Sequence, residues 1–427
     1  MSIFNFNLFS KLRSIKNIHK IYRNMMIKKN KPVSMNEFKK LGEIQNKSTD
    51  IILQISKILK KTHPVFNKLS KEDLLNVSVA ISEIYKGKKN QISYQILNKS
   101  KLKYNDFIQI YDYFRYLGLY EIGLKFRDTA CDNLISENPK NLNLMENMRR
   151  LIICIQLEKI KSFAELEKEI DRLNGLSSLQ KKWLRQSGAI YFNKNELKQR
   201  SWNQKNKIFA QFLKNKSIAI VGPLEVNADL NLEIDNYDIV IRFHFDGRNK
   251  LYKKNKKGTK VSITYFNGER GDYFRKTQSF IPMELDWIVY KKKYNNFDQP
   301  ASKKHQNMRS LDFTQPLVPS NGNFNLLPIC IADLIFHGAE NIYIYANDLE
   351  LSPTREKNYY PKTWNYHGKE KELQNESDHD PLTQFDFIKK MFEKKILKGD
   401  LRFTDVMGMS RQQFAQKIQN NHQKIKL

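Results

Sequence analysis

From residue 217 onward, short apolar runs alternate with helix-like segments, and this alternation restricts the fold more than any other feature. The apolar runs are residues 217–221, 237–242, 261–266, 287–290 and 341–345. The segment 325–336 before the last run has the length and composition of a helix stopped by Gly338. Strands that alternate with helices usually pair in parallel, and apolar runs indicate a sheet covered on both faces. The sequence therefore predicts an α/β, Rossmann-like domain with a mostly parallel sheet.

The preceding part of the chain has a different period. Between residues 35 and 214 apolar positions recur at spacings of three and four, which is typical of amphipathic helices. One such helix face is formed by Phe107, Ile110, Tyr111, Phe114 and Leu117. Gly118 then ends this helix and Tyr120 begins the next, which predicts a helical hairpin. We divide the chain into a basic N-terminus (1–34), an all-α helical-hairpin region (35–214) and the α/β domain (215–427), and expect the helical region to be a scaffold or partner-binding module.

The charge of the chain is strongly positive, with 74 Lys and Arg against 45 Asp and Glu. Such an excess favours a polyanionic neighbour, which is nucleic acid, an anionic membrane or a phosphorylated substrate. The lysines are scattered through every segment, a pattern that compositional bias also produces. No nucleic-acid-binding module accompanies them, so we predict no nucleic-acid partner. The three cysteines form no CxxC pair, which argues against a zinc site or disulfide framework and favours a reducing cytosol.

The first 31 residues mix apolar and basic positions without an apolar run long enough to span a membrane. Two interpretations stay open: a basic amphipathic helix that contacts anionic lipid, and a solvated, partly ordered terminus. The expected location is cytoplasmic, with peripheral contact at the inner membrane face under the first interpretation.

Ligands of open α/β sheets bind at the carboxyl ends of the strands. That rule selects Gly222 after the first apolar run, Arg242 and His244 at the end of the second, and Asn267 after the third. It also selects the segment 347–348. The chain contains neither GxGxxG nor GxxxxGK[ST] at the first turn, so a dinucleotide site or P-loop is not expected.

Two further segments carry candidate chemistry. Ser320, Asn321 and Gly322 precede a predicted helix, whose first N–H groups would bind a phosphate or carboxylate unless the segment is an ordinary helix cap. His379 lies between Asp378 and Asp380, ahead of a helix predicted at 381–393. The flanking carboxylates suit a general base that accepts a proton from a hydroxyl, but a surface cap has the same pattern. Asp378-His-Asp380 also has the DxD form of a metal-binding motif.

The order of these segments resembles that of the animal-type sialyltransferase family, glycosyltransferase family 29. Ile218-Ala-Ile-Val-Gly222, together with the segment from Ile234-Asp to Arg242, resembles the long sialylmotif, and Gly258-Thr-Lys the segment that follows it. Pro319-Ser-Asn-Gly322 resembles the start of the short sialylmotif. His379 with Gln384 five residues later resembles the very short motif. The resemblance covers roughly residues 216–395.

This resemblance implies a GT-A-like variant fold in a bacterial-type member with an extra helical region. It implies an inverting transfer of sialic acid, or a related nonulosonic acid, from its CMP conjugate to a glycan or lipid-linked hydroxyl, without metal or cofactor. His379 would be the general base, and the donor would be bound by Gly222, Arg242, His244, Asn267, Ser320, Asn321, Gly322, Tyr366 and His367. Tyr359-Tyr360 is an alternative to Tyr366-His367.

The chain departs from the family pattern at four positions. Pro223 and His244 stand where the family usually has asparagine, Gln384 replaces a glutamate, and Ile218 stands where animal enzymes have a cysteine. Two other hypotheses therefore remain: a metal-dependent transferase that uses another nucleotide sugar, with Asp378 or Asp380 as ligand, and a non-catalytic interaction protein with a degenerate nucleotide fold.

Overall fold

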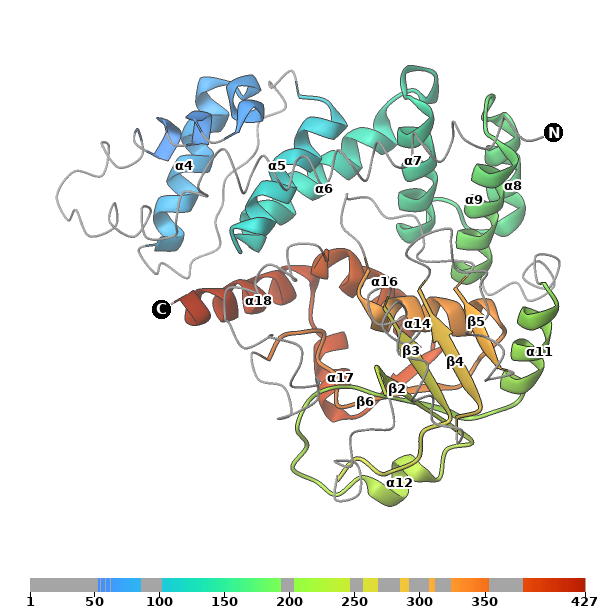
Figure 1. Cartoon of the computed structure of the whole chain (residues 1–427). Coiled ribbons are helices and arrows are strands. Elements are labelled where there is room, and N and C mark those ends of the chain that lie inside the picture. Colours follow the sequence, from blue (N-terminus) through green and yellow to red (C-terminus); the bar gives the residue numbers. More distant parts are fainter. Residues whose placement is uncertain are drawn as a thin grey trace, which may run out of the picture.

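The computed structural model describes residues 53–85 (apart from 54, 58 and 62), 102–192, 203–245, 256–267, 285–291, 307–311, 324–352 and 379–426. Helices from the first half of the chain lie along one side of a seven-stranded sheet (Figure 1). In the helical region the elements are η1 Pro64–Lys68, α4 Lys71–Tyr85, α5 Tyr104–Tyr116, α6 Tyr120–Ser136, η2 Pro139–Asn141, α7 Leu144–Gln156, α8 Phe163–Arg172 and α9 Ser178–Tyr191.

Helices α5 and α6 pack against each other across a tight turn at Gly118. Gly118 has a φ of 75°, a left-handed conformation that glycine adopts without a steric penalty. Most of the apolar side chains of α6 are buried, and Phe114 of α5 stacks on Phe126 of α6 at 5.7 Å between ring centroids.

The sheet consists of β1 Ile218–Val221, β2 Ile239–Phe243, β3 Ile263–Phe266, β4 Trp287–Tyr290, β5 Met308–Ser310, β6 Ile342–Tyr345 and β7 Leu397–Gly399. Its order is β5-β4-β3-β2-β1-β6-β7, and every pair of neighbours is parallel. All four residues of β1 are buried, as expected for a central strand covered on both faces. The predicted α/β class and parallel sheet are confirmed.

The remaining helices are α11 Gln204–Leu213, α12 Asn231–Asp235, α14 Leu326–Phe336, α16 Pro381–Glu393, α17 Leu401–Met407 and α18 Arg411–Lys426. Ile234 of α12 covers one face of the sheet, where it joins a small core with Ala219, Val221 and Val240. The other face is covered by α14 and by α11, whose Phe209 packs on Trp287 at 5.1 Å between ring centroids. Helix α11 thus packs on the sheet although it lies before the predicted boundary at residue 215.

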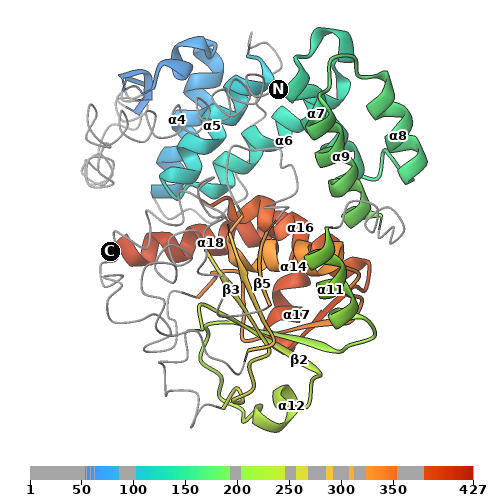
Figure 2. The ribbon, with the colours of Figure 1, turned by 45° about the vertical axis from the view of Figure 1, so that its right-hand side comes forward.

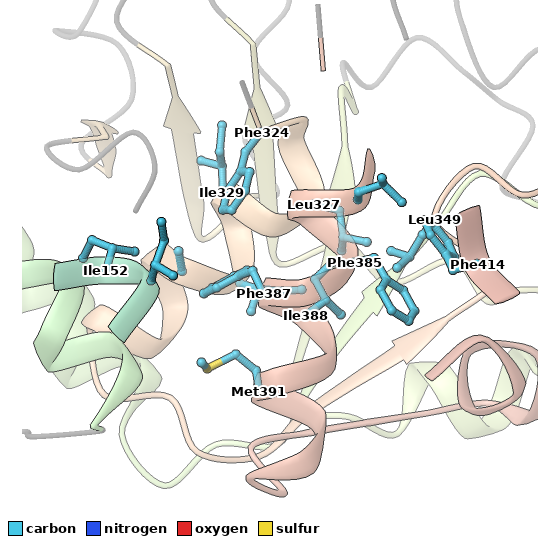
Figure 3. Close-up of a cluster of buried hydrophobic side chains, with 14 of the residues drawn as sticks. Ile152, Phe324, Leu327, Ile329, Leu349, Phe385, Phe387, Ile388, Met391 and Phe414 are labelled. Atoms are coloured by element: carbon cyan, nitrogen blue, oxygen red, sulfur yellow. The ribbon is translucent and has the colours of Figure 1, made fainter. Parts of the chain in front are cut away.

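One hydrophobic core extends from the helical region into the sheet domain. Figure 3 shows Ile152 of α7 pointing toward Phe387 of α16, with Ile388 and Met391 further along the same helix. Helix α18 lies against α6, between the helical region and the sheet (Figure 2). Because burial of one such side chain contributes about 1.5–3 kcal/mol, this shared core stabilises each region through the other.

Candidate functional site

The strands β1 and β6 are neighbours at the point where the strand order reverses. The chain leaves β1 toward β2 on one side, and leaves β6 toward β7 on the other. The turns that follow two such strands separate and form a crevice, which is where open α/β sheets bind ligands. Of the positions selected from the sequence, Gly222 follows β1, Arg242 and His244 lie at the end of β2, and residues 347–348 follow β6, so all of them lie at one edge of the sheet.

A cleft of about 100 Å³ occupies this crevice. Its walls come from the turn after β1 (Pro223), the end of β2 (His244), the turn after β6 (Asn347 to Glu350) and the first turn of α14 (Leu327). Figure 3 draws Leu327 and Leu349, two of the lining residues, in one buried cluster with Phe385 of α16. The cleft therefore rests directly on the core.

Unusual backbone conformations gather at this cleft. Among the described residues, seven other than glycine have a positive φ, and four of these lie in or beside the cleft: His244 (56°), Ala346 (52°), Leu349 (54°) and Glu350 (69°). Each costs about 1–2 kcal/mol relative to the right-handed conformation. Such strain persists only where its surroundings hold it in place, and it clusters at functional sites. One restraint is Asp400, whose Oδ2 accepts a hydrogen bond from the N–H of Ala346 at 2.6 Å.

Gly222 lets the turns after β1 and β6 touch. Its N–H donates to the carbonyl of Tyr345 at 2.8 Å. A Cβ at this position would overlap the carbonyl oxygen of Ala346 and come within 2.9 Å of the Asn347 side chain. Gly222 was selected from the sequence as a position where backbone can approach a ligand closely. In the structure, what approaches it is the backbone of the turn after β6.

Two buried cations brace the turn after β1. Arg242 and Lys257 are each 2% exposed. The Nη2 of Arg242 donates to the carbonyls of Lys257 at 2.6 Å and Gly258 at 2.9 Å, and the Nζ of Lys257 donates to the carbonyls of Gly222 at 3.2 Å and Leu224 at 3.0 Å. Arg242 therefore supports the loop that carries Lys257 and is not among the cleft-lining residues, contrary to the direct donor contact expected of it. The two charges raise the electrostatic potential at the β1 turn.

The aspartates of the segment that resembles the long sialylmotif have structural roles. Asp235 accepts hydrogen bonds from the N–H groups of Thr259 at 2.9 Å and Lys260 at 3.0 Å, and Asp238 accepts one from the N–H of Ser217 at 2.8 Å. Gly258, with a φ of 76°, makes the turn that this bonding requires. The segment that resembles the long sialylmotif and the segment at 258–260 that resembles its continuation are thus in direct contact.

His244 and Asn267 both follow the ends of strands but have different positions. His244 lines the cleft, and its N–H donates to the carbonyl of Tyr265 at 3.0 Å. Asn267 follows β3, is partly buried, and is not among the residues that line the cleft. The predicted residues Ser320, Asn321, Gly322, Tyr366 and His367 lie outside the described residues.

His379 and Asp380 immediately precede α16, the helix predicted at 381–393, and Asp380 is its N-cap residue. The Asp380 carboxylate is 1% exposed and caps this helix by accepting hydrogen bonds from the Thr383 N–H at 3.1 Å and hydroxyl at 2.6 Å. It also accepts one from the Tyr111 hydroxyl at 2.5 Å. This buried, fully engaged carboxylate is unsuited to the metal-ligand role considered for Asp380. His379 itself is partly exposed.

One hydrogen bond connects the first turn of α16 to the cleft. Oε1 of Gln384 accepts it from the N–H of Asn325 at 3.3 Å, and Asn325 lines the cleft. Asn325 also caps α14 through the N–H of Leu327 and donates to Glu350 at 3.2 Å. Asn325, Glu350, Lys257 and Asp400 were not selected from the sequence. The only signal for any of them was the place of Asn325 at the start of a predicted helix.

A second, larger cleft of about 390 Å³ lies between α6, α7, α16 and the start of α18. Its charged walls already pair with each other, since Arg127 contacts Asp386 at 2.6 Å and Arg411 contacts Asp128 at 3.0 Å. It is also away from the carboxyl ends of the strands. We therefore take the smaller cleft as the candidate site despite its size.

Comparison with models of protein families, with curated proteins and with solved structures gives no match to this chain. Within the part of the chain that the structure describes, no His, Cys, Asp and Glu side chains gather in threes or more as metal ligands do. In that same part, no helix is both long and apolar enough for a membrane span.

Proposed function

We propose that this protein is a glycosyltransferase that moves sialic acid, or a related nonulosonic acid, from its CMP conjugate to a glycan hydroxyl. The transfer would invert the anomeric configuration and need no metal ion. The observation that carries the proposal is that the residues directly after the two long-motif segments, Pro223 and His244 among them, line one strained cleft at the point where the strand order reverses.

Positive charge behind the cleft favours the anionic half of such a donor, while Glu350 and Asp348, the latter paired with Arg402, line the cleft itself. Buried Arg242 and Lys257 place positive charge behind the turn at Gly222, and the N-terminal end of α14 opens at the opposite wall. Positive charge favours phosphate and carboxylate, and so does the dipole at the N-terminal end of α14, where the Leu327 N–H is already bonded to Asn325. In this proposal His244, which lines the cleft, contacts the donor directly, and Gly222 shapes the turn that forms one of its walls. Ser320, Asn321, Gly322, Asn267, Tyr366 and His367 keep the donor-binding roles that the resemblance implies.

His379 is the proposed general base. As the acceptor oxygen attacks the anomeric carbon, the imidazole takes the hydroxyl proton, and the bond to phosphate breaks with its electron pair leaving on CMP. A base in this role contributes typically 10²–10⁴-fold to the rate. The acceptor in the proposal is a glycan or lipid-linked sugar, and a cytoplasmic location with peripheral contact at an anionic membrane fits such an acceptor.

The experiment is calorimetry of CMP binding to the full chain, with CDP and UDP as controls and EDTA present throughout. We expect selective CMP binding in wild type and His379→Ala, with transfer from a CMP-sugar lowered at least about 100-fold in the variant. Preference for UDP, or binding only after metal is restored, would support the metal-dependent alternative. Binding of no nucleotide would support the interaction protein.

A pair of lysine variants tests the location of the site. Lys257→Met removes the buried charge behind the β1 turn and should weaken CMP binding about 10-fold, equivalent to about 1.4 kcal/mol. Lys398→Met removes an exposed lysine from β7 and should leave binding unchanged. Equal affinities in the two folded variants, as verified by circular dichroism, would place the nucleotide elsewhere.

A further inference from the structure

Helix α5 makes direct polar contacts with the two residues that immediately precede α16. Nη1 of Arg115 donates to the carbonyl oxygen of His379 at 2.5 Å, and the hydroxyl of Tyr111 donates to Oδ1 of Asp380 at 2.5 Å. Tyr111 and Arg115 are one helical turn apart, so one face of α5 holds two consecutive residues of a segment more than 260 positions later in the chain.

These contacts lie in the interior. Tyr111 is 0% exposed and Arg115 is 6% exposed. Hydrogen bonds that involve a charged partner contribute about 1.5–3 kcal/mol, and leaving a buried charge without its partner costs more. Burial raises the pKa of the Tyr111 hydroxyl and the Asp380 charge raises it further, so the hydroxyl remains a donor at neutral pH. Arg115 is itself held by Asp112 at 3.2 Å.

The same line of contacts continues along α16. Arg127 of α6 donates to the Asp386 carboxylate at 2.6 Å and lies 3.4 Å from the Thr383 hydroxyl, whose own hydrogen is donated to Asp380. The helical region therefore fixes the backbone of residue 379, the cap at 380 and the first two turns of the helix. Holding the carbonyl of His379 and the carboxylate of the following residue fixes the position of the His379 backbone, and with it the point from which the imidazole projects.

We propose that α5 is part of the catalytic apparatus, with Tyr111 and Arg115 as positioning residues that hold the backbone of His379 where its imidazole can act. The proposal rests on the function proposed above, which makes His379 the base. It gives the helical region a role that neither a scaffold nor a partner-binding module supplies: without α5 the sheet domain would retain its nucleotide cleft but would lack a positioned base.

The test compares Tyr111→Phe, Arg115→Met and Arg115→Lys in the full chain, with Tyr104→Phe as the matched control. Tyr104 is a buried tyrosine of the same helix whose hydroxyl lies 3.5 Å from Arg149, away from α16. Three quantities are measured at a temperature where every variant is folded: hydrogen exchange of the Thr383 and Gln384 amides, the dissociation constant of CMP, and kcat for sugar transfer from a CMP-sugar.

We expect amide exchange in Tyr111→Phe and Arg115→Met to be at least about tenfold faster, and kcat to fall about 10- to 100-fold, as for a misplaced catalytic group. CMP affinity should stay within about twofold, because α5 does not line the cleft, and Arg115→Lys should restore part of kcat. Tyr104→Phe should match wild type in all three. A general loss of stability would lower CMP binding together with kcat and would not be relieved by lysine.

The outcomes separate the two proposals. If wild type fails to bind CMP or to transfer sugar, the proposed function fails, and the exchange rates alone decide whether α5 holds the segment. If wild type is active while Tyr111→Phe and Arg115→Met keep its kcat, or if their exchange rates equal those of Tyr104→Phe, the positioning role is wrong.

Discussion

Gly222 is the residue at which the turn after β1 meets the turn after β6, and it illustrates how the cleft depends on single positions. Its missing side chain allows backbone to pack on backbone, while Ala346 and Leu349 opposite hold left-handed conformations. A side chain at position 222 would push on Ala346, whose N–H is held by a hydrogen bond to Asp400.

Gly222→Ala should lower the free energy of unfolding by about 1–3 kcal/mol, because the added methyl group overlaps backbone that cannot move away cheaply. CMP binding should weaken in the folded fraction. Gly408→Ala is the matched control, since its Cβ would have its nearest contact at 3.5 Å and its φ is −69°. Urea unfolding measures both, and an unchanged midpoint for Gly222→Ala would contradict the steric argument.

At the scale of elements, a buried polar cluster centred on an ion pair joins two helices, α11 and α14, to two strands of the sheet, β3 and β5. Asp333 of α14 pairs with Arg309 of β5 and accepts a hydrogen bond from Tyr265 of β3 at 2.7 Å, while Arg309 donates to Asn206 of α11 at 3.3 Å. Burial raises the pKa of Asp333, but the charges of Arg309 and His337 outweigh it and hold the pKa well below the ordinary value.

Asp333→Asn should destabilise the fold by about 3–5 kcal/mol, because it leaves the Arg309 charge buried without its counterion. The ionised carboxylate stabilises the fold above its unfolded pKa, about 4, and that contribution disappears as the pH falls toward the folded value. The gap between wild type and variant should therefore shrink below about pH 4. Denaturant unfolding between pH 3 and 7 measures it, with exposed Asp405→Asn as control; a gap independent of pH would be inconsistent with ionised Asp333.

Several strands were predictable from the sequence within two residues, and others were not. β1, β2, β3, β4 and β6 are buried apolar runs, a signal that depends on local composition alone. β5 and β7 are three residues long and read Met-Arg-Ser and Leu-Lys-Gly, with too few apolar positions to distinguish them from loops. They become strands only because β4 and β6 provide edges to pair with.

The site was predictable only in part, for a similar reason. The carboxyl-end rule needs the strands alone, and it selected His244, which lines the cleft, and Gly222, which packs on the turn after β6. The bracing role of Arg242 depends on where the loop at 257–260 folds, and the contacts of Asp380 depend on α5, more than 260 residues earlier in the chain. Contacts between residues so far apart in the chain cannot be predicted from the spacing of residue types within a short segment.

At the scale of the whole molecule, the shared core should make unfolding a single transition. The far-UV circular dichroism follows the helices of both regions, of which α4 to α9 form the larger part, while Trp287 reports on β4 within the sheet. In a variant with Trp183, Trp202 and Trp364 replaced by phenylalanine, the two signals should give the same urea midpoint, as two-state unfolding requires. Separate midpoints would mean that the helical region and the sheet domain fold independently.

The contact between Tyr111 and Asp380 also has a consequence for synthesis. A ribosome that adds roughly 5–20 residues per second needs about 13–54 s to cover the 269 positions between them. During that time Tyr111 and Arg115 are synthesised without the partners that they contact in the finished fold. Asp400, which restrains Ala346 beside the cleft, follows 20 residues after Asp380, so the contact with α5 and the cleft are both completed only near the end of synthesis.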